Sequence, residues 1–258
     1  MPTIAQPATA QPLGPGPHLL RFLTAWLGVW PSPGRFRVAP SARRVTRGWD
    51  NQVHQLMGVA ADERFGHAVA LSVPPLNFGS IREFVEAHAR CSIGDRQVLE
   101  ALLPAALGTP ERRYIEATLR WTTQPAPLPE VGTWRRSDDP GLPSWLLPFN
   151  GAVLVATDRA GRYAAGVGIK QHNRFGHEIA VETNPDSRGR GLARALVAQA
   201  ARHVLAAGAI PIYIHDLDNT GSAHVAEAAG FPDRGWRWLG LAEQPIAPPQ
   251  ETLAARKR

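Results

Sequence analysis

The most constraining feature of this 258-residue chain is the stretch from His177 to Phe231. An apolar run leads through an Arg- and Gly-rich turn into a long Ala-rich segment, and a second apolar run and a second helical segment follow. This alternation is typical of an α/β fold, in which a strand that follows a helical crossover runs parallel to the strand before it. The sequence therefore predicts parallel strands at 177–183 and 210–214, joined by a helix over 190–207.

The turn that opens this helix has the features of a phosphate site. Gly189 and Gly191 let the main chain approach a ligand closely. The start of the helix adds unpaired N–H groups and the positive end of its dipole, which together bind phosphate or pyrophosphate. Two common phosphate motifs are excluded, because the chain has no Gly-Lys-Ser/Thr tripeptide and Arg194 replaces the third glycine of a dinucleotide fingerprint.

Two spaced motifs carry a resemblance to a known family. The turn fits Arg/Gln-x-x-Gly-x-Gly/Ala at Arg188, Gly191 and Ala193. A second pattern is met by Asn219, Ser222, Gly230 and Phe231. In this order, with a helix and a strand between them, the motifs resemble those of the GNAT superfamily of N-acetyltransferases. The resemblance covers roughly residues 134–241. It implies an α/β fold whose sheet mixes parallel and antiparallel strands, and it implies acetyl-CoA as co-substrate.

The resemblance also implies the residues that bind this cofactor. They are Val181, Glu182, Thr183, Arg188, Gly189, Arg190, Gly191, Leu192, Ala193, Arg194, Asn219 and Ser222. For the three residues before the turn, the expected role lies in the main chain, which would pair with the pantetheine arm as if it were another strand. Asn219 is explained equally well as a helix cap.

The acid–base residues are less clearly marked. In many relatives a carboxylate base stands eleven residues before the first Arg/Gln of the motif, a position that falls on His177 here, with Glu178 beside it. Since side chains alternate along a strand, only one of the two should reach the cleft. We expect His177 to be the base and Glu178 to be the alternative, with His172, His215 and His224 as lesser candidates. Relatives often carry a tyrosine seven residues after the Asn, and its hydroxyl can protonate the leaving CoA thiolate. This chain has Ala226 at that position, so another group or water must supply the proton.

The implied reaction is direct transfer of acetyl from acetyl-CoA to a primary amine of a small molecule or protein, without a metal. A non-catalytic acyl-CoA-binding module is the alternative, because Ala226 removes the usual acid. The formal charge of +6 and the isoelectric point near 10.4 permit nucleic-acid binding. However, the basic residues are scattered and lack interleaved aromatic residues, so we expect no specific nucleic-acid partner.

The rest of the chain predicts four segments, divided by the Pro-rich run at 124–129. These are a disordered leader (1–17), an N-terminal α/β region of unknown role (18–123), the GNAT-type catalytic domain (130–242) and a flexible basic tail (243–258). A single cysteine, Cys91, fits a reducing cytoplasm. The leader lacks signal-peptide features and the apolar run 18–30 is too short to span a membrane. We therefore expect a cytoplasmic protein with no membrane partner, and a homodimer is left open.

Local patterns predict further elements. Helices are expected at 18–30, from a capping box at Ser80 through His88, and after a cap at Asp95. The stretch 110–121 is expected to be helical and then extended. Strands are expected at 68–73, 152–157 and 163–170, the last two as a hairpin, with a short helical turn at 143–147.

Overall fold

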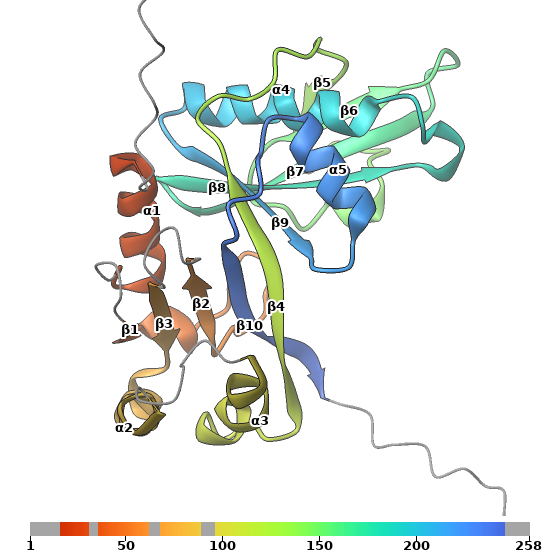
Figure 1. The fold of residues 1–258 in the computed structure, drawn as a ribbon. Helices are drawn as coiled ribbons and strands as arrows, with labels where there is room; N and C mark the ends of the chain where they lie inside the picture. Colours follow the sequence, from red (N-terminus) through yellow and green to blue (C-terminus); the bar gives the residue numbers. More distant parts are fainter. Residues whose placement is uncertain (1–15, 31–35, 62–67, 89–95, 246–258) are drawn as a thin grey trace, which may run out of the picture.

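The computed structural model describes residues 16–30, 36–61, 68–88 and 96–245 (Figure 1). The helices are α1 (Pro17–Leu27), α2 (Phe78–His88), α3 (Arg96–Ala106), α4 (Leu192–Ala206) and α5 (Thr220–Ala228). The strands are β1 (Phe36–Pro40), β2 (Met57–Ala60), β3 (Val69–Val73), β4 (Arg112–Trp121), β5 (Thr133–Arg135), β6 (Val153–Thr157), β7 (Tyr163–Asn173), β8 (Gly176–Thr183), β9 (Ile210–Asp216) and β10 (Arg237–Pro245).

These strands form one ten-stranded sheet in the order β1-β3-β2-β10-β4-β9-β8-β7-β6-β5. The pairs β1–β3 and β8–β9 are parallel and the other neighbours are antiparallel, so the expected α/β class with a mixed sheet is confirmed. The helices and strands predicted in the C-terminal half are confirmed with small changes at their ends, as is the 3₁₀ turn at Ser144–Leu146. The first helix, α1, begins at Pro17. The helix α4 ends just before Gly208, whose φ is positive at 77°.

Two expectations in the N-terminal half differ from the structure, and others fall on residues outside the described ranges. The helical start expected at 110–121 is wrong, because β4 is extended throughout and is paired with β10 on one edge and β9 on the other. Such pairing overrides the local helix propensity of the segment. The capping box at Ser80 is also wrong, since α2 begins two residues earlier and the Ser80 hydroxyl donates to the Asn77 carbonyl at 3.0 Å. Asp95 and Cys91 lie outside the described residues.

The sheet is continuous across the expected boundary at 124–129. β4 precedes that boundary, yet it lies between β9 and β10, which follow it. The boundary segment is also held in place, since Ala126 N donates to Ala229 O at 2.9 Å and the Arg202 guanidinium donates to the Ala126 and Leu128 carbonyls. β10 runs to Pro245, three residues into the expected tail. The division into separate folding units stays a prediction.

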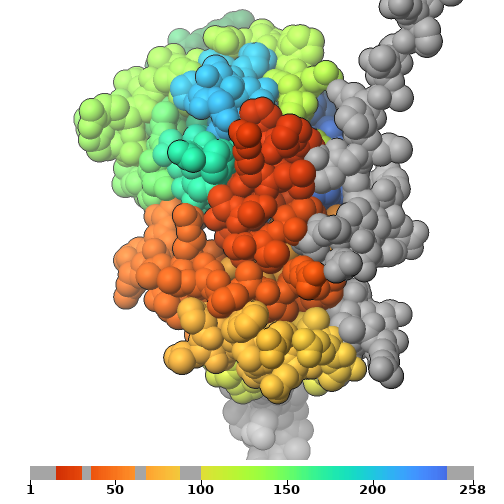
Figure 2. Space-filling view, turned by 90° about the vertical axis from the view of Figure 1, so that its left-hand side faces the viewer, coloured from red at the N-terminus to blue at the C-terminus, as the bar shows by residue number. Residues whose placement is uncertain are grey.

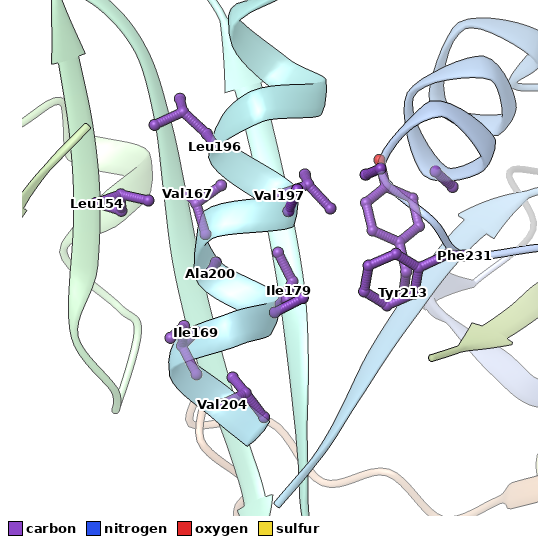
Figure 3. Packing of buried hydrophobic residues seen from close by; sticks show 14 of the residues in the cluster. Leu154, Val167, Ile169, Ile179, Leu196, Val197, Ala200, Val204, Tyr213 and Phe231 are labelled. Carbon is purple, nitrogen blue, oxygen red and sulfur yellow. The ribbon is translucent and has the colours of Figure 1, made fainter. Parts of the chain in front are cut away.

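Helices cover both faces of the sheet. α4 and α5 pack on one face of β6–β9, where Leu196, Val197, Ala200 and Val204 of α4 meet Ile179 of β8 in a buried cluster (Figure 3). α1 packs on the opposite face, and its apolar side is buried against β3, β7 and β9. Figure 2 shows α1 in red, lying between the N-terminal part in orange and yellow and the C-terminal part in green and cyan. α2 and α3 cover the far end of the sheet.

Candidate functional site

β8 and β9 lie side by side only where they begin. Their parallel pairing runs from Gly176 opposite Ile210 to Glu178 opposite Ile212. Beyond that point β8 continues to Thr183 without pairing to β9, which bonds to β4 along its other edge. The two strands therefore separate into a gap near the middle of the sheet.

Main-chain groups of β8 face this gap. Asn184 N donates to Ala164 O on the far side at 2.9 Å, and bonded and non-bonded pairs alternate along an antiparallel ladder. Glu182, two residues earlier, is therefore bonded to β7, whereas Val181 and Thr183 turn their N–H and C=O groups toward the gap. Of the three residues expected to pair with a cofactor through the main chain, two are placed to do so.

Thr183 adds a second sign that the gap accepts a polar ligand. Its Oγ1 is buried and has no hydrogen-bond partner. Buried hydroxyls in folded proteins are almost always satisfied, so an orphaned one that lines a cavity indicates a missing partner.

The turn before α4 presents an open helix start. Gly189 and Gly191 have φ angles of 74° and 75°, which residues with a Cβ rarely adopt. Gly191 occupies the N-cap position, where no side chain caps the helix, and Ala195 N donates to its carbonyl at 3.3 Å. The N–H groups of residues 192–194 therefore have no partner within the helix, and the first turn contains no acidic residue. This is the arrangement that binds phosphate groups.

Three arginines surround this turn. Arg188, Arg190 and Arg194 are exposed, and none of them forms an ion pair with another described residue. Arg190 Nη2 donates to the Asp186 carbonyl at 3.3 Å. Their charge therefore adds to the positive end of α4.

The start of α5 forms the opposite wall of the gap. Asn219 caps α5 by accepting a bond from Ser222 N at 2.9 Å, which confirms that it is a helix cap. The Ser222 hydroxyl lies 2.8 Å from the Tyr213 hydroxyl, which reaches it from β9. Tyr213 is 2% exposed and packs near Phe231 (Figure 3). Burial raises the pKa of Tyr213, so the phenol stays protonated and can donate a hydrogen bond.

A single cavity of about 820 Å³ unites these features. All twelve residues expected to bind the cofactor line it, as do Ser187, Tyr213, Gly221, His224, Val225 and Ala228. The role of the twelve in binding stays a prediction. Tyr213 was missed because its signal is weak: it alternates with Ile212 and Ile214, which places it on the face of the sheet that carries α5, but nothing local marks it as polar or reactive.

A second cavity, of about 380 Å³, is lined by Glu178 and Ile214, the residues that flank the point where β8 and β9 separate. Its other walls come from β7, from residues 43–57, and from Trp26, Asn150 and Trp238. Glu178 is three positions before Val181, about 10 Å along an extended strand. The two cavities thus approach the same gap, one from each end.

Glu178 is buried in a network of charged groups. Its Oε1 lies 2.6 Å from Lys170 Nζ and its Oε2 lies 2.9 Å from His172 Nε2. Burial alone would raise the pKa of Glu178, but Lys170 and the hydrogen bond from His172 outweigh it and lower the pKa to about 2. The carboxylate is therefore ionised at any physiological pH.

His177 points the other way. It shares the face of Ile179, which packs on α4, and it lines neither cavity. Burial, with the nearby His172 and His203, lowers the pKa of His177. We expected His177 rather than Glu178 to reach the cleft, and the structure reverses this orientation. The reason is the register of β8, in which even-numbered residues face away from α4.

Comparison with known proteins assigns this part of the chain. Residues 115–231 match the sequence model of the acetyltransferase (GNAT) family, a range that begins in β4 and ends at Phe231. This segment is therefore a GNAT acetyltransferase domain. No curated protein matches the chain.

Solved GNAT structures align with the chain at low identity. One from Novosphingobium aromaticivorans, described as a GNAT-family acetyltransferase, is 22% identical, with a TM-score of 0.39 over 50% of this chain. The alignment spans 64% of that protein, slightly under two thirds. A GNAT-family acetyltransferase from Colwellia psychrerythraea is 12% identical over 69% of this chain and 77% of its own, with a TM-score of 0.42. A GCN5-related N-acetyltransferase from Sphaerobacter thermophilus is 20% identical over 76% and 83%, with a TM-score of 0.37.

A search for membrane spans finds no described helix with the length and apolar character needed to cross a bilayer.

Proposed function

We propose that this GNAT domain transfers an acetyl group from acetyl-CoA to a primary amine. The observation that carries the proposal is the separation of β8 and β9 directly after Glu178, with the open helix start of α4 at one end of the gap and a charged cavity at the other. An acyl-CoA and an acceptor would then meet in the gap from opposite ends.

The chain's own groups account for binding of the CoA part. The N–H groups of 192–194 and the three arginines of the turn would hold the pyrophosphate. The main chain of Val181 and Thr183 would bond to the pantetheine arm, and Thr183 Oγ1 would gain the partner that it lacks. One of the N–H groups of β8 would polarise the thioester carbonyl, because such groups stabilise the oxyanion when they are aimed at it in advance.

The acceptor amine would enter through the cavity beside Glu178. Its nitrogen attacks the carbonyl carbon, the carbon–sulfur bond breaks, and the nitrogen loses a proton. The His172–Glu178 pair is placed to receive that proton, because a histidine whose Nε2 is bonded to a carboxylate keeps Nδ1 free to accept. Glu178 by itself, with a pKa of about 2, is too weak a base for an ammonium group.

Tyr213 takes the place of the missing family acid. The thiolate that leaves needs a proton, and Ala226 cannot supply one. The Tyr213 hydroxyl lines the cofactor cavity from β9 and is held in position by Ser222. Ala226 is completely buried in the same apolar cluster as the Tyr213 ring, so a small residue on α5 leaves room for a tyrosine from the strand. Transfer is direct, without a covalent intermediate on the protein.

Two measurements on the full chain test this proposal. Calorimetry should detect binding of acetyl-CoA, and release of free CoA thiol should depend on an added amine from a panel that includes amino acids, polyamines and peptides. Binding with no thiol release across the panel would instead support a non-catalytic acyl-CoA-binding module. Failure to bind acetyl-CoA would refute both functions.

A further inference from the structure

The cavity beside Glu178 carries an excess of positive charge. The charged side chains that line it are Arg43, Arg44, Arg47, Lys170, Asp50 and Glu178. Both carboxylates are already engaged. Asp50 Oδ2 lies 2.9 Å from His54 Nε2, and Glu178 is held by Lys170 and His172. Lys170 and Glu178 offset each other, which leaves the three arginines against the single carboxylate of Asp50.

Each arginine is held by a main-chain carbonyl instead of a carboxylate. Arg43 Nη1 donates to His172 O at 3.1 Å, Arg44 Nη1 to His54 O at 3.3 Å and Arg47 Nη1 to Asn51 O at 2.7 Å. Within the described ranges, none of the three has an acidic side chain in ion-pair distance. A carbonyl orients a guanidinium without cancelling its charge, so these groups are positioned to bind an anion.

Arg44 shows this most clearly. It is only 4% exposed, and its Nε is buried with no hydrogen-bond partner. Burial, together with the nearby Arg43, lowers the pKa of Arg44 to about 10, so it is still cationic at neutral pH. A buried guanidinium with an unused donor is costly unless a ligand completes it. The planar fork of arginine matches a carboxylate, which can accept two parallel bonds.

The remaining walls suit a small organic body. Trp26, Trp49 and Trp238 line the cavity. Trp26 packs on His172 with ring centroids 4.7 Å apart, and Lys170 Nζ lies 4.8 Å from the ring centroid of Trp49. The aromatic rings offer apolar contact between the two polar ends, and about 380 Å³ is at the small end of the range for ligand pockets.

We propose that the acceptor is a small primary amine that also carries a carboxylate, with its carboxylate bound by Arg44 and its amine directed to His172 and Glu178. This inference rests on the proposed acetyl transfer and names its substrate class. The same positive charge assists the chemistry, because a cationic environment favours the neutral, nucleophilic form of an amine.

The test compares amines that differ only at the anionic end. Calorimetry on the full chain measures binding of α-amino acids and of ω-amino acids with three to six carbons, each beside its carboxamide and its aminophosphonate counterpart. We expect the carboxylates to bind about 10- to 100-fold more tightly than the amides. Equal binding of carboxylate and amide would overturn the proposal. Tighter binding of the phosphonates would show that the site selects phosphate-type acceptors, which also overturns it.

Variants locate the effect. Arg44→Met should abolish the preference for carboxylates, Arg44→Lys should retain only part of it, and Arg159→Met, at an exposed arginine outside both cavities, should leave it intact. If Arg44→Met does not fold, Arg47→Gln at an exposed position should still weaken carboxylate binding several-fold. An unchanged preference in the folded variants overturns the assignment. Because binding is measured without turnover, failure of acetyl transfer and failure of carboxylate recognition are distinguished.

Discussion

Lys170 Nζ lies 2.6 Å from Glu178 Oε1 across the β7–β8 ladder, and both residues line the smaller cavity. Lys170 keeps the buried carboxylate ionised, while His172 occupies its second oxygen. Glu178 therefore acts in the cavity as a fixed negative charge that orients the Lys170 ammonium group and the His172 ring.

This arrangement predicts different roles for the neighbours His172 and His177. His172→Gln and Glu178→Gln should each lower turnover by about 100-fold while acetyl-CoA affinity stays within about twofold, since general-base removal typically has that size of effect. His177→Gln is the matched control and should change turnover little. Steady-state rates of thiol release measure this. If His177→Gln alone abolishes turnover, the base acts from the α4 face and our assignment is wrong.

His177 should instead influence stability. Its pKa in the folded protein lies below the ordinary histidine value of 6.5, so the unfolded chain binds more protons in the interval between the two values. The free energy of unfolding should therefore fall as the pH drops below about 6.5, and His177→Gln should flatten that part of the curve. Urea titrations of both proteins from pH 5 to 8 measure it. Parallel curves for the two proteins would contradict this account.

How far the sequence predicts each structural feature depends on how far apart along the chain the interacting residues lie. The turn at 188–191 was predictable because the positive φ angles of Gly189 and Gly191 and the open helix start are local properties. The strand β4 was not predictable, because it pairs with β9 and β10, which lie about 90 and 120 residues away along the chain.

The site divides in the same way. The cavity of about 820 Å³ follows motifs that the sequence displays, and all twelve residues expected to bind the cofactor line it. The cavity beside Glu178 is also lined by Arg44 from the N-terminal half, 134 positions earlier, and no pattern within either segment predicts that the two residues share a cavity. The choice between His177 and Glu178 as the base stays a prediction. Alternation shows that the two side chains face opposite ways, but the register that places Glu178 in the cavity is set by pairing with β7.

Tyr213 is expected to protonate the leaving thiolate. Tyr213→Phe removes the hydroxyl and keeps the ring, so turnover should fall by about 10- to 100-fold while acetyl-CoA still binds. Tyr114→Phe is the matched control, because Tyr114 is also buried, with its hydroxyl bonded to Glu116, but lies outside both cavities. Single-turnover rates isolate the chemical step. Equal rates for the two variants would assign the proton to water.

The turn before α4 is tested as a phosphate site by substituting two glycines that have the same main-chain geometry. Gly189 and Gly161 have φ angles of 74° and 77°, and a Cβ at either position would meet nothing within 4 Å. A glutamate should therefore strain the main chain equally at both sites, but only Gly189→Glu places a negative charge beside the helix start. We expect Gly189→Glu to weaken acetyl-CoA binding by at least about 30-fold in calorimetry, with Gly161→Glu close to wild type. Equal affinities would refute the site.

The last prediction concerns the division of the chain. The expected catalytic segment 130–242 lacks β2 and β4, so removing residues 1–129 would expose one edge of β9 and both edges of β10. It would also remove α1, together with Leu119 and Trp121 of the core that α1 covers. Unpaired edges and a lost apolar layer promote aggregation rather than folding. We therefore expect fragment 130–242 to show no cooperative thermal transition by circular dichroism, whereas fragment 16–245, which keeps every described element, should unfold in one step. Cooperative unfolding of 130–242 would establish it as an independent domain and show that β4 is dispensable to it.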